Sequence, residues 1–227
     1  MTAHILSNPA WHSLAGPHSR YSSGTQGARR YAKGYSPIFG FADPSTADFT
    51  DVAPFCDVGE PLYCVGWSGP TPDDWRLEID TFGHQMMWQG KLPERDDALG
   101  AVRLGAQHVP QVMELVALTK PGPFAERTLE LGEYYGIFEG ERLVAMAGER
   151  LGTDEYREIS GVCTHPDFQG RGLARRLVLM LVRIEMLRGQ NPFLHVLDYN
   201  HHARSIYQRM GFKVREAITF RLLRRTA

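Results

Sequence analysis

The stretch "HPDFQGRGLARRLVLMLVRIEML", residues 165–187, places two glycines around one arginine directly before an almost wholly apolar segment. The apolar segment is typical of a helix that packs in a core, and Gly189 predicts where that helix ends. The first N–H groups of a helix have no partner within it, and glycines let such groups approach an anion closely. The stretch therefore predicts a pyrophosphate site at a helix N-terminus, to which Arg171 adds a positive charge.

Three classes of phosphorylated ligand bind to loops of this kind. A nucleoside triphosphate loop requires Gly-Lys followed by Ser or Thr, and the chain contains no such triplet. A dinucleotide loop requires a third glycine, where this chain has Arg175, and it belongs to a doubly wound parallel sheet. Coenzyme A is the third class, and neither objection applies to it.

The pattern around the loop predicts an α+β (mixed α/β) fold. Hairpin-like strands precede the loop, and a strand–helix–strand crossover follows, so we expect a mixed, mostly antiparallel sheet flanked by helices. In the first part of the chain we expect an irregular packed segment over 1–40, a short helix over 44–56 and a strand over 61–67. The polar segment 90–100, which contains Pro93 and two glycines, is interpreted as a linker.

Composition excludes several classes of protein for this chain of 227 residues. Three cysteines without CxxC spacing argue against a disulfide framework and against a cysteine-rich zinc site. The first residues do not resemble a signal peptide, and charges interrupt the most apolar run, so we expect a cytoplasmic protein with no membrane partner. From Arg171 onward there are 12 basic and three acidic residues, against 13 and 23 before it. This basic last quarter indicates a phosphorylated ligand, nucleic acid or solvated helix faces, and charge alone does not decide between them.

Two segments resemble the signatures of a known family. "QGRGLA" (169–174) is similar to the Gln/Arg-x-x-Gly-x-Gly/Ala signature of the GNAT superfamily of N-acetyltransferases, and "NHHARSIYQRMGF" (200–212) resembles its second signature. The resemblance covers about 98–227 and implies a GNAT acetyl-CoA-binding catalytic domain there. Four further segments resemble a bacterial group that is distantly similar to glycine N-acyltransferases and whose N-terminal half is degenerate. They are "LTKPGPFAERT" (118–128), "LVAMAGERL" (143–151), "GVCTHPDFQGRG" (161–172) and "PFLHV" (192–196). We therefore expect a smaller, degenerate acetyltransferase-like half over 1–97.

The resemblance implies acetyl-CoA as the cofactor, and it assigns binding roles to residues of both segments. The loop amides would hold the pyrophosphate, the strand around Cys163 would pair with the pantetheine arm, and Asn200 would help hold two strands apart. The implied binding residues are Val162, Cys163, Thr164, Gln169, Gly170, Arg171, Gly172, Leu173, Ala174, Asn200, Ala203 and Tyr207.

The resemblance also implies two catalytic residues. Tyr207 would donate a proton to the leaving thiolate, although helical spacing also suits a tyrosine in the core. Glu158 would be the base that deprotonates the amine, with a pKa raised by partial burial; an ordinary surface role and a rival base at Glu149 remain open. His195, His201 and His202 are interpreted as structural, and we expect no metal site. Covalent transfer through Cys163 is not expected.

These residues together predict an acyl-CoA-dependent N-acyltransferase. It would transfer acetyl directly from acetyl-CoA to a primary amine of a small molecule or peptide, with oxyanion stabilisation from the backbone around Val162. The alternatives are a glycine-type enzyme with longer acyl donors and a non-catalytic acyl-CoA-binding or regulatory module. We expect a monomer or homodimer that binds no nucleic acid and no second coenzyme in its N-terminal half. Phe124 and Arg127, in the loop 119–128, are the candidate acceptor-pocket residues.

Overall fold

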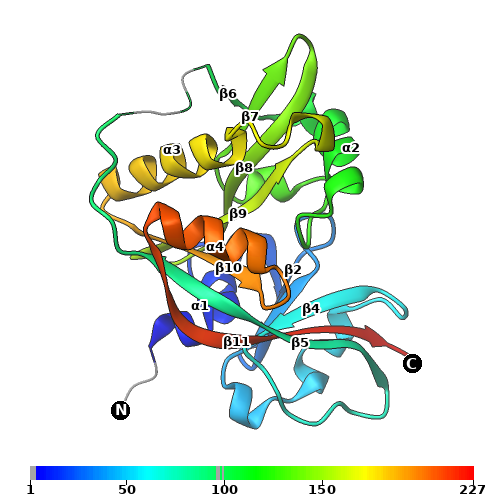
Figure 1. Cartoon of the computed structure of the whole chain (residues 1–227). Helices are drawn as coiled ribbons and strands as arrows, with labels where there is room; N and C mark the ends of the chain where they lie inside the picture. Colours follow the sequence, from blue (N-terminus) through cyan, green and yellow to red (C-terminus); the bar gives the residue numbers. More distant parts are fainter. Residues whose placement is uncertain (1–3, 96–97, 99) are drawn as a thin grey trace.

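A single mixed sheet organises the chain in the computed structural model, which describes residues 4–95, 98 and 100–227 (Figure 1). Its strand order is β1-β2-β3-β4-β11-β5-β10-β9-β8-β7-β6. The strands are β1 (Ser22–Gly24), β2 (Ala28–Tyr31), β3 (Ile38–Phe41), β4 (Pro61–Val65), β5 (Trp75–Trp88), β6 (Val102–Arg103), β7 (Tyr134–Glu139), β8 (Arg142–Gly152), β9 (Tyr156–Thr164), β10 (Asn191–Leu197) and β11 (Phe212–Arg225). The helices are α1 (Pro9–Ala15), α2 (Val109–Thr119), α3 (Leu173–Leu187) and α4 (His201–Met210).

The two halves of the chain exchange their last strands. Each half has antiparallel strands followed by one parallel pair, which is β3 with β4 in the first half and β9 with β10 in the second. The long strand β5 of the first half then pairs with β10, and the long strand β11 of the second half pairs with β4. β5 and β11 also pair with each other along nearly their whole lengths. The halves therefore form one continuous sheet rather than two sheets in contact.

The helices cover opposite faces of the C-terminal half of the sheet. α3 buries Leu177, Leu181 and Val182 against one face, together with Ala145 and Ala147 of β8. α2 buries Val112 and Leu115 against the other face, where it packs with Met146. Successive strand residues point to opposite faces, so Met146 and its neighbours Ala145 and Ala147 contact different helices. α1 packs on the same face as α2. The hydrophobic cluster around α1 includes Phe193 of β10, whereas the next residue, Leu194, points to the opposite face and lies in the cluster around α3.

β9 and β10 separate after a short parallel contact. They pair only between residues 191–193 and 156–158. The register of β9 against β8 then shifts between Ser160 and Cys163, where Gly161 adopts a φ of +64° that favours glycine. Beyond this bulge, the edges of β9 and β10 that face each other carry no strand pairing in the described chain. The separation creates a gap that opens towards the N-terminus of α3.

Several predicted elements are confirmed, and others are wrong. The mixed sheet, the strand at 61–67 and the helices that end before Gly189 and Gly211 are confirmed. The predicted helix at 44–56 is wrong, because three separate 3₁₀ turns occupy that segment. Prolines and Asp N-caps interrupt it, so the pieces stay short. The first 40 residues contain α1 but also three strands that were not predicted. No described helix is long and apolar enough to cross a membrane.

Candidate active site

The predicted anion loop lies at the N-terminus of α3. Gly170 and Gly172 have φ values of +77° and +73°, and a β-carbon at either position would have no atom within 4 Å. Gly172 is the N-cap residue, and no side chain caps the helix. Within the described chain, the backbone N–H groups of residues 170–174 donate no hydrogen bond. These exposed groups and the positive end of the helix dipole fit the pyrophosphate of a coenzyme.

Arg171 and Thr164 approach the same region from the loop and from β9. The guanidinium of Arg171 stacks over the ring of Phe168, with its carbon 4.8 Å from the ring centroid. Val162 and Thr164 are partly buried on the edge of β9 that lacks a neighbouring strand, whereas Cys163 is buried towards α2. An extended chain such as a pantetheine arm fits an open strand edge of this kind.

α4 brings the residues of the second signature to the other side of the gap. The side chain of Asn200 caps α4, since its Oδ1 accepts a hydrogen bond from the backbone N–H of Ala203 at 3.1 Å. Tyr207 lies about two turns after Asn200. It is partly buried, and its ring packs edge-on against Phe212. Burial, and then the nearby Cys163, raise the pKa of Tyr207 to about 12. The phenol therefore keeps its proton at neutral pH and is able to donate it.

Glu158 is completely buried and fully hydrogen bonded. Its carboxylate accepts two hydrogen bonds from Arg150, at 3.0 and 2.8 Å, and one from the backbone of Leu151 at 3.2 Å. Nδ1 of His195 lies 2.7 Å from the same carboxylate. Burial alone would raise the pKa of Glu158, but Arg150 and His195 outweigh burial and lower it below its usual range. The expected raised pKa is therefore wrong, because the sequence did not reveal that Arg150 faces this glutamate.

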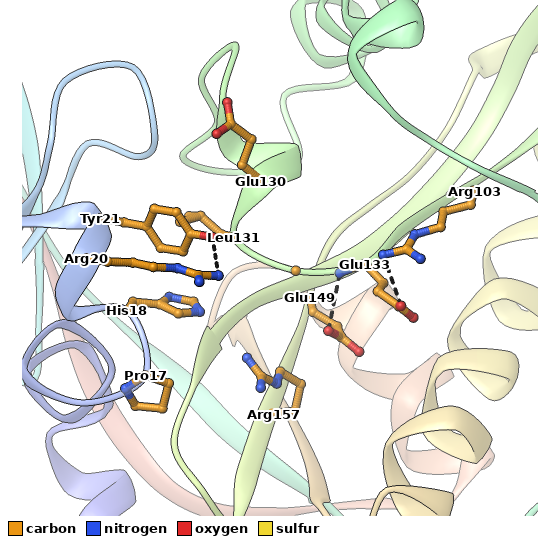
Figure 2. Close-up of a pocket in the computed structure, with 11 residues that line it drawn as sticks. Pro17, His18, Arg20, Tyr21, Arg103, Glu130, Leu131, Glu133, Glu149 and Arg157 are labelled. Atoms are coloured by element: carbon orange, nitrogen blue, oxygen red, sulfur yellow. Dashed lines mark hydrogen bonds and ion pairs between the residues drawn. The ribbon is translucent and has the colours of Figure 1, made fainter.

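The rival residue Glu149 points to the other face of the sheet. Its Oε1 accepts a hydrogen bond from Arg188 at 2.9 Å, and its Oε2 accepts one from the backbone of Glu133 at 3.3 Å. It lines a hollow of about 330 Å³ together with Arg157 and Arg103, at the end of β9 remote from the α3 loop (Figure 2). The structure therefore does not bring Glu149 to the gap between β9 and β10.

The loop before β7 supplies the remaining side chains of the site. Phe124 packs edge-on against Tyr134, with ring centroids 5.5 Å apart, and both rings lie against the bulge at Gly161. Arg127 instead pairs with Glu130 and stacks over Tyr35, so it attaches the loop to the N-terminal half. Sequence reasoning missed Tyr134 and Arg150, because their neighbours across the strands were unknown.

Comparison with known proteins identifies the family. The model of the FR47-like protein family matches residues 134–221. A solved structure from Novosphingobium aromaticivorans, described as an acetyltransferase from the GNAT family, superposes with a TM-score of 0.92. It is 34% identical, and the match covers 99% of this chain and 100% of that one. The chain belongs to the GNAT family of N-acetyltransferases.

Two further relatives of this GNAT protein are more distant. The N-alpha-acetyltransferase RimI of Mycobacterium tuberculosis is 37% identical over 84 residues, which are 35% of this chain and 51% of RimI. The match thus spans about half the length of that curated relative. A GCN5-related N-acetyltransferase from Kribbella flavida superposes with a TM-score of 0.59 at 14% identity over 94% of this chain and 93% of its own. The second comparison shows the fold alone.

The GNAT membership confirms the predicted family, fold and class of enzyme. The described residues contain no cluster of His, Cys, Asp and Glu suited to a metal ion. Burial raises the pKa of the Cys163 thiol to about 11, so the thiol stays protonated at neutral pH and is a poor nucleophile. His195 lies within the Glu158 network. Its Nε2 is 3.1 Å from the side-chain nitrogen of Gln85, as expected for a structural histidine.

Proposed function

We propose that this protein transfers acetyl from acetyl-CoA directly to a primary amine of a small molecule or peptide. One observation supports the proposal above all. The unpartnered N–H groups of residues 170–174 lie at the end of the gap between the open edges of β9 and β10, and the Tyr207 phenol lies close to Cys163 of β9. Each of these features suits a different part of one extended thioester ligand.

The chain offers a separate element for each part of the coenzyme. The N–H groups from Gln169 to Ala174 would hold the pyrophosphate, with Arg171 beside them. The edge of β9 at Val162 and Thr164 would hold the pantetheine arm, next to Ala203 and Tyr207 of α4. The residues present therefore fit the coenzyme, which would supply an activated acyl group.

The proposed chemistry needs a proton donor, an oxyanion donor and an amine in its neutral form. Tyr207 holds a proton at neutral pH and would donate it to the thiolate sulfur as that sulfur leaves. The proton that the nitrogen releases as the amide forms would then restore the Tyr207 phenol. A backbone N–H near Val162, at the bulge, would stabilise the oxyanion. Glu158 is ionised but saturated with hydrogen bonds, so we assign it a positioning role that fixes Arg150 and His195. The amine would then bind after losing its proton to solvent.

A thiol-release assay tests the function. Purified protein is mixed with acetyl-CoA and, separately, with amino acids, polyamines, aminoglycosides, aryl amines and peptide N-termini. Peptides are included because the RimI relative is by name an N-alpha-acetyltransferase. Amine-dependent release of CoA, with an acetylated product seen by mass spectrometry, is expected. Binding of acetyl-CoA without turnover of any amine would favour a non-catalytic module, and faster turnover of longer acyl-CoA donors would favour the glycine-type alternative.

Replacing Tyr207 with phenylalanine is expected to lower kcat by roughly 10- to 1,000-fold, a loss typical of a missing general acid. The ring packing against Phe212 survives in the variant, so the Kd for acetyl-CoA should hardly change. Steady-state kinetics and calorimetry measure the two quantities. Tyr199→Phe is the control, since Tyr199 is 71% exposed. A normal kcat in the Tyr207 variant, with chemistry rate-limiting, would remove Tyr207 from the mechanism.

Replacing Glu158 with glutamine is expected to lower kcat/KM by the same factor from about pH 6 to 10. The lowered pKa keeps this carboxylate ionised throughout that range, so its loss has no pH-dependent component. The variant also leaves Arg150 buried without a counter-ion, which costs about 3 kcal/mol of unfolding free energy in a urea titration. Glu130→Gln, in the exposed pair with Arg127, should cost under about 1 kcal/mol.

The pair of Glu158 with Arg150 also determines how the stability of the protein changes at acid pH. A carboxylate whose pKa is lowered by folding stabilises the protein above its unfolded pKa of about 4.3, and that stabilisation is lost as the pH falls further. The wild type should therefore lose stability below about pH 4 more steeply than the Glu158→Gln variant. A kcat/KM defect that shrinks at high pH would instead identify Glu158 as a base.

A further inference from the structure

Tyr134 has a buried hydroxyl group that lacks a partner in the part of the chain that the structure describes. The residue is 1% exposed and begins β7 on the face that carries α2. Among the described residues, no group forms a hydrogen bond with its hydroxyl. Leaving a buried hydroxyl unpaired is costly, so each such group in a native protein calls for an explanation, such as a bound water, ion or ligand. A ligand that arrives at this hydroxyl would supply the missing partner.

The hydroxyl end of Tyr134 lies at the bulge of β9. A β-carbon placed on Gly161 would lie 3.0 Å from Cε1 of Tyr134 and 3.3 Å from Cε2 of Phe124. Cε1 is bonded to the carbon that carries the hydroxyl, so this group is adjacent to the bulge. The next residue is Val162, whose backbone borders the gap between β9 and β10. Tyr134 therefore approaches the proposed acetyl position from the face opposite α3 and α4, which is the side left for an acceptor.

Charges around Tyr134 favour an uncharged amine. Burial raises the pKa of its phenol, which therefore stays neutral and can both accept and donate a hydrogen bond. The nearby carboxylate of Glu158 is saturated by Arg150 and His195. An additional ammonium group in this region would be buried without a counter-ion, at a considerable desolvation cost. The rings of Tyr134 and Phe124 instead offer an apolar wall.

We infer that the Tyr134 hydroxyl receives the acceptor nitrogen, and that the acceptor is a small monoamine with an apolar or aromatic body rather than a polycation. This inference rests on the proposed acetyl transfer and adds to it the residue that positions the amine and the class of that amine. The phenol oxygen accepts an N–H of the neutral amine, which directs the nitrogen lone pair towards the thioester carbon. No bond to Tyr134 forms or breaks.

Two conjugates test this inference separately from coenzyme binding. In each, the CoA sulfur is joined through an acetyl linker to the nitrogen of phenethylamine or to a terminal nitrogen of spermidine. Calorimetry should show that the wild type binds the phenethylamine conjugate at least 10-fold more tightly than CoA and gains nothing from spermidine. Tyr134→Phe should bind the phenethylamine conjugate about 10-fold more weakly than the wild type does, with an unchanged Kd for CoA. Tyr135→Phe is the matched control, because its hydroxyl bonds to Glu133 on the other face.

The outcomes separate the two proposals. If the wild type does not bind CoA, the proposed function fails and this inference fails with it. If CoA binds but Tyr134→Phe keeps the full gain, or if the wild type gains nothing from the phenethylamine conjugate, only the Tyr134 assignment is overturned. Tighter binding of the spermidine conjugate would overturn the acceptor class. A thermal midpoint of Tyr134→Phe at or above that of the wild type, as expected when an unpaired buried hydroxyl is removed, would show that its loss of binding does not come from unfolding.

Discussion

Acetyl-CoA binding should disappear, with a Kd raised at least 100-fold, when Gly172 is replaced by glutamate. The new carboxylate would stand at the N-cap of α3, among the unpartnered N–H groups of residues 170–174, where the pyrophosphate is proposed to bind. Repulsion and the loss of amide contacts together would exceed about 2.7 kcal/mol, which corresponds to the 100-fold change. Isothermal titration with acetyl-CoA measures the effect.

Gly189→Glu is the matched control for the negative charge and the backbone strain that Gly172→Glu also introduces. Gly189 lies at the opposite end of α3 with a φ of +77°, close to the +73° of Gly172, and a β-carbon would meet no atom at either position. Gly189→Glu therefore introduces the same charge and the same left-handed strain, about 1–2 kcal/mol, far from the loop. It should bind acetyl-CoA normally. Equal affinity of both variants and the wild type would show that the loop at 169–174 does not hold the coenzyme.

A fragment of residues 98–227 should fail to fold, although it contains both signature motifs. It lacks β5, which lies between β10 and β11 and pairs with both. Without β5, β10 and β11 would each have an unpaired edge in the middle of the sheet, and such edges promote aggregation. The buried side chains of Met86 and Gln85 would also be missing from between them. Solubility and circular dichroism of the purified fragment test this expectation.

Co-expression supplies the control for the fragment. Residues 1–97, produced in the same cell, should restore a soluble complex, because the break falls in the segment that the sequence predicts to be a linker. That complex and the intact chain should each bind one acetyl-CoA. Between β9 and β10 the chain has α3, whose N-terminus is proposed to hold the pyrophosphate, whereas between β3 and β4 it has three 3₁₀ turns and no such helix. A stable, active fragment would contradict the role assigned to β5. Two coenzymes per chain would contradict the expectation that the N-terminal half binds none.

The C-terminal half was predictable because its signals are local. The glycines at 170 and 172, the apolar run after them and Gly189 all act within a few residues, and the structure has α3 and its loop as expected. The second signature likewise forms α4, with Asn200 as its cap. Helix ends depend on nearby backbone groups, so short motifs carry enough information to locate them.

Side-chain environments depend on neighbours that are distant in the sequence, and the predictions failed there. Burial raises the pKa of Glu158, but Arg150 on the adjacent strand and His195 beyond the crossover helix outweigh burial and lower it. In the sequence, Arg183 and Glu185 are the charges that interrupt the apolar run 177–187, yet burial raises the pKa of Glu185 well above its usual value. No pattern within either segment distinguishes a solvated glutamate from a buried one, because the difference arises only when strands and helices pack.

The exchange of strands between the halves also limits how the molecule can move. A hinge between the halves would have to break the ladders of β5 with β10 and of β11 with β4, whose hydrogen bonds act together across the sheet. Domain closure of the kind seen in many two-lobed enzymes is therefore unavailable to this chain. Entry of the amine and departure of its product must depend on local segments such as residues 120–127, which belong to no strand. Turnover would then be limited by loop rearrangement or by chemistry, and not by the opening of two lobes.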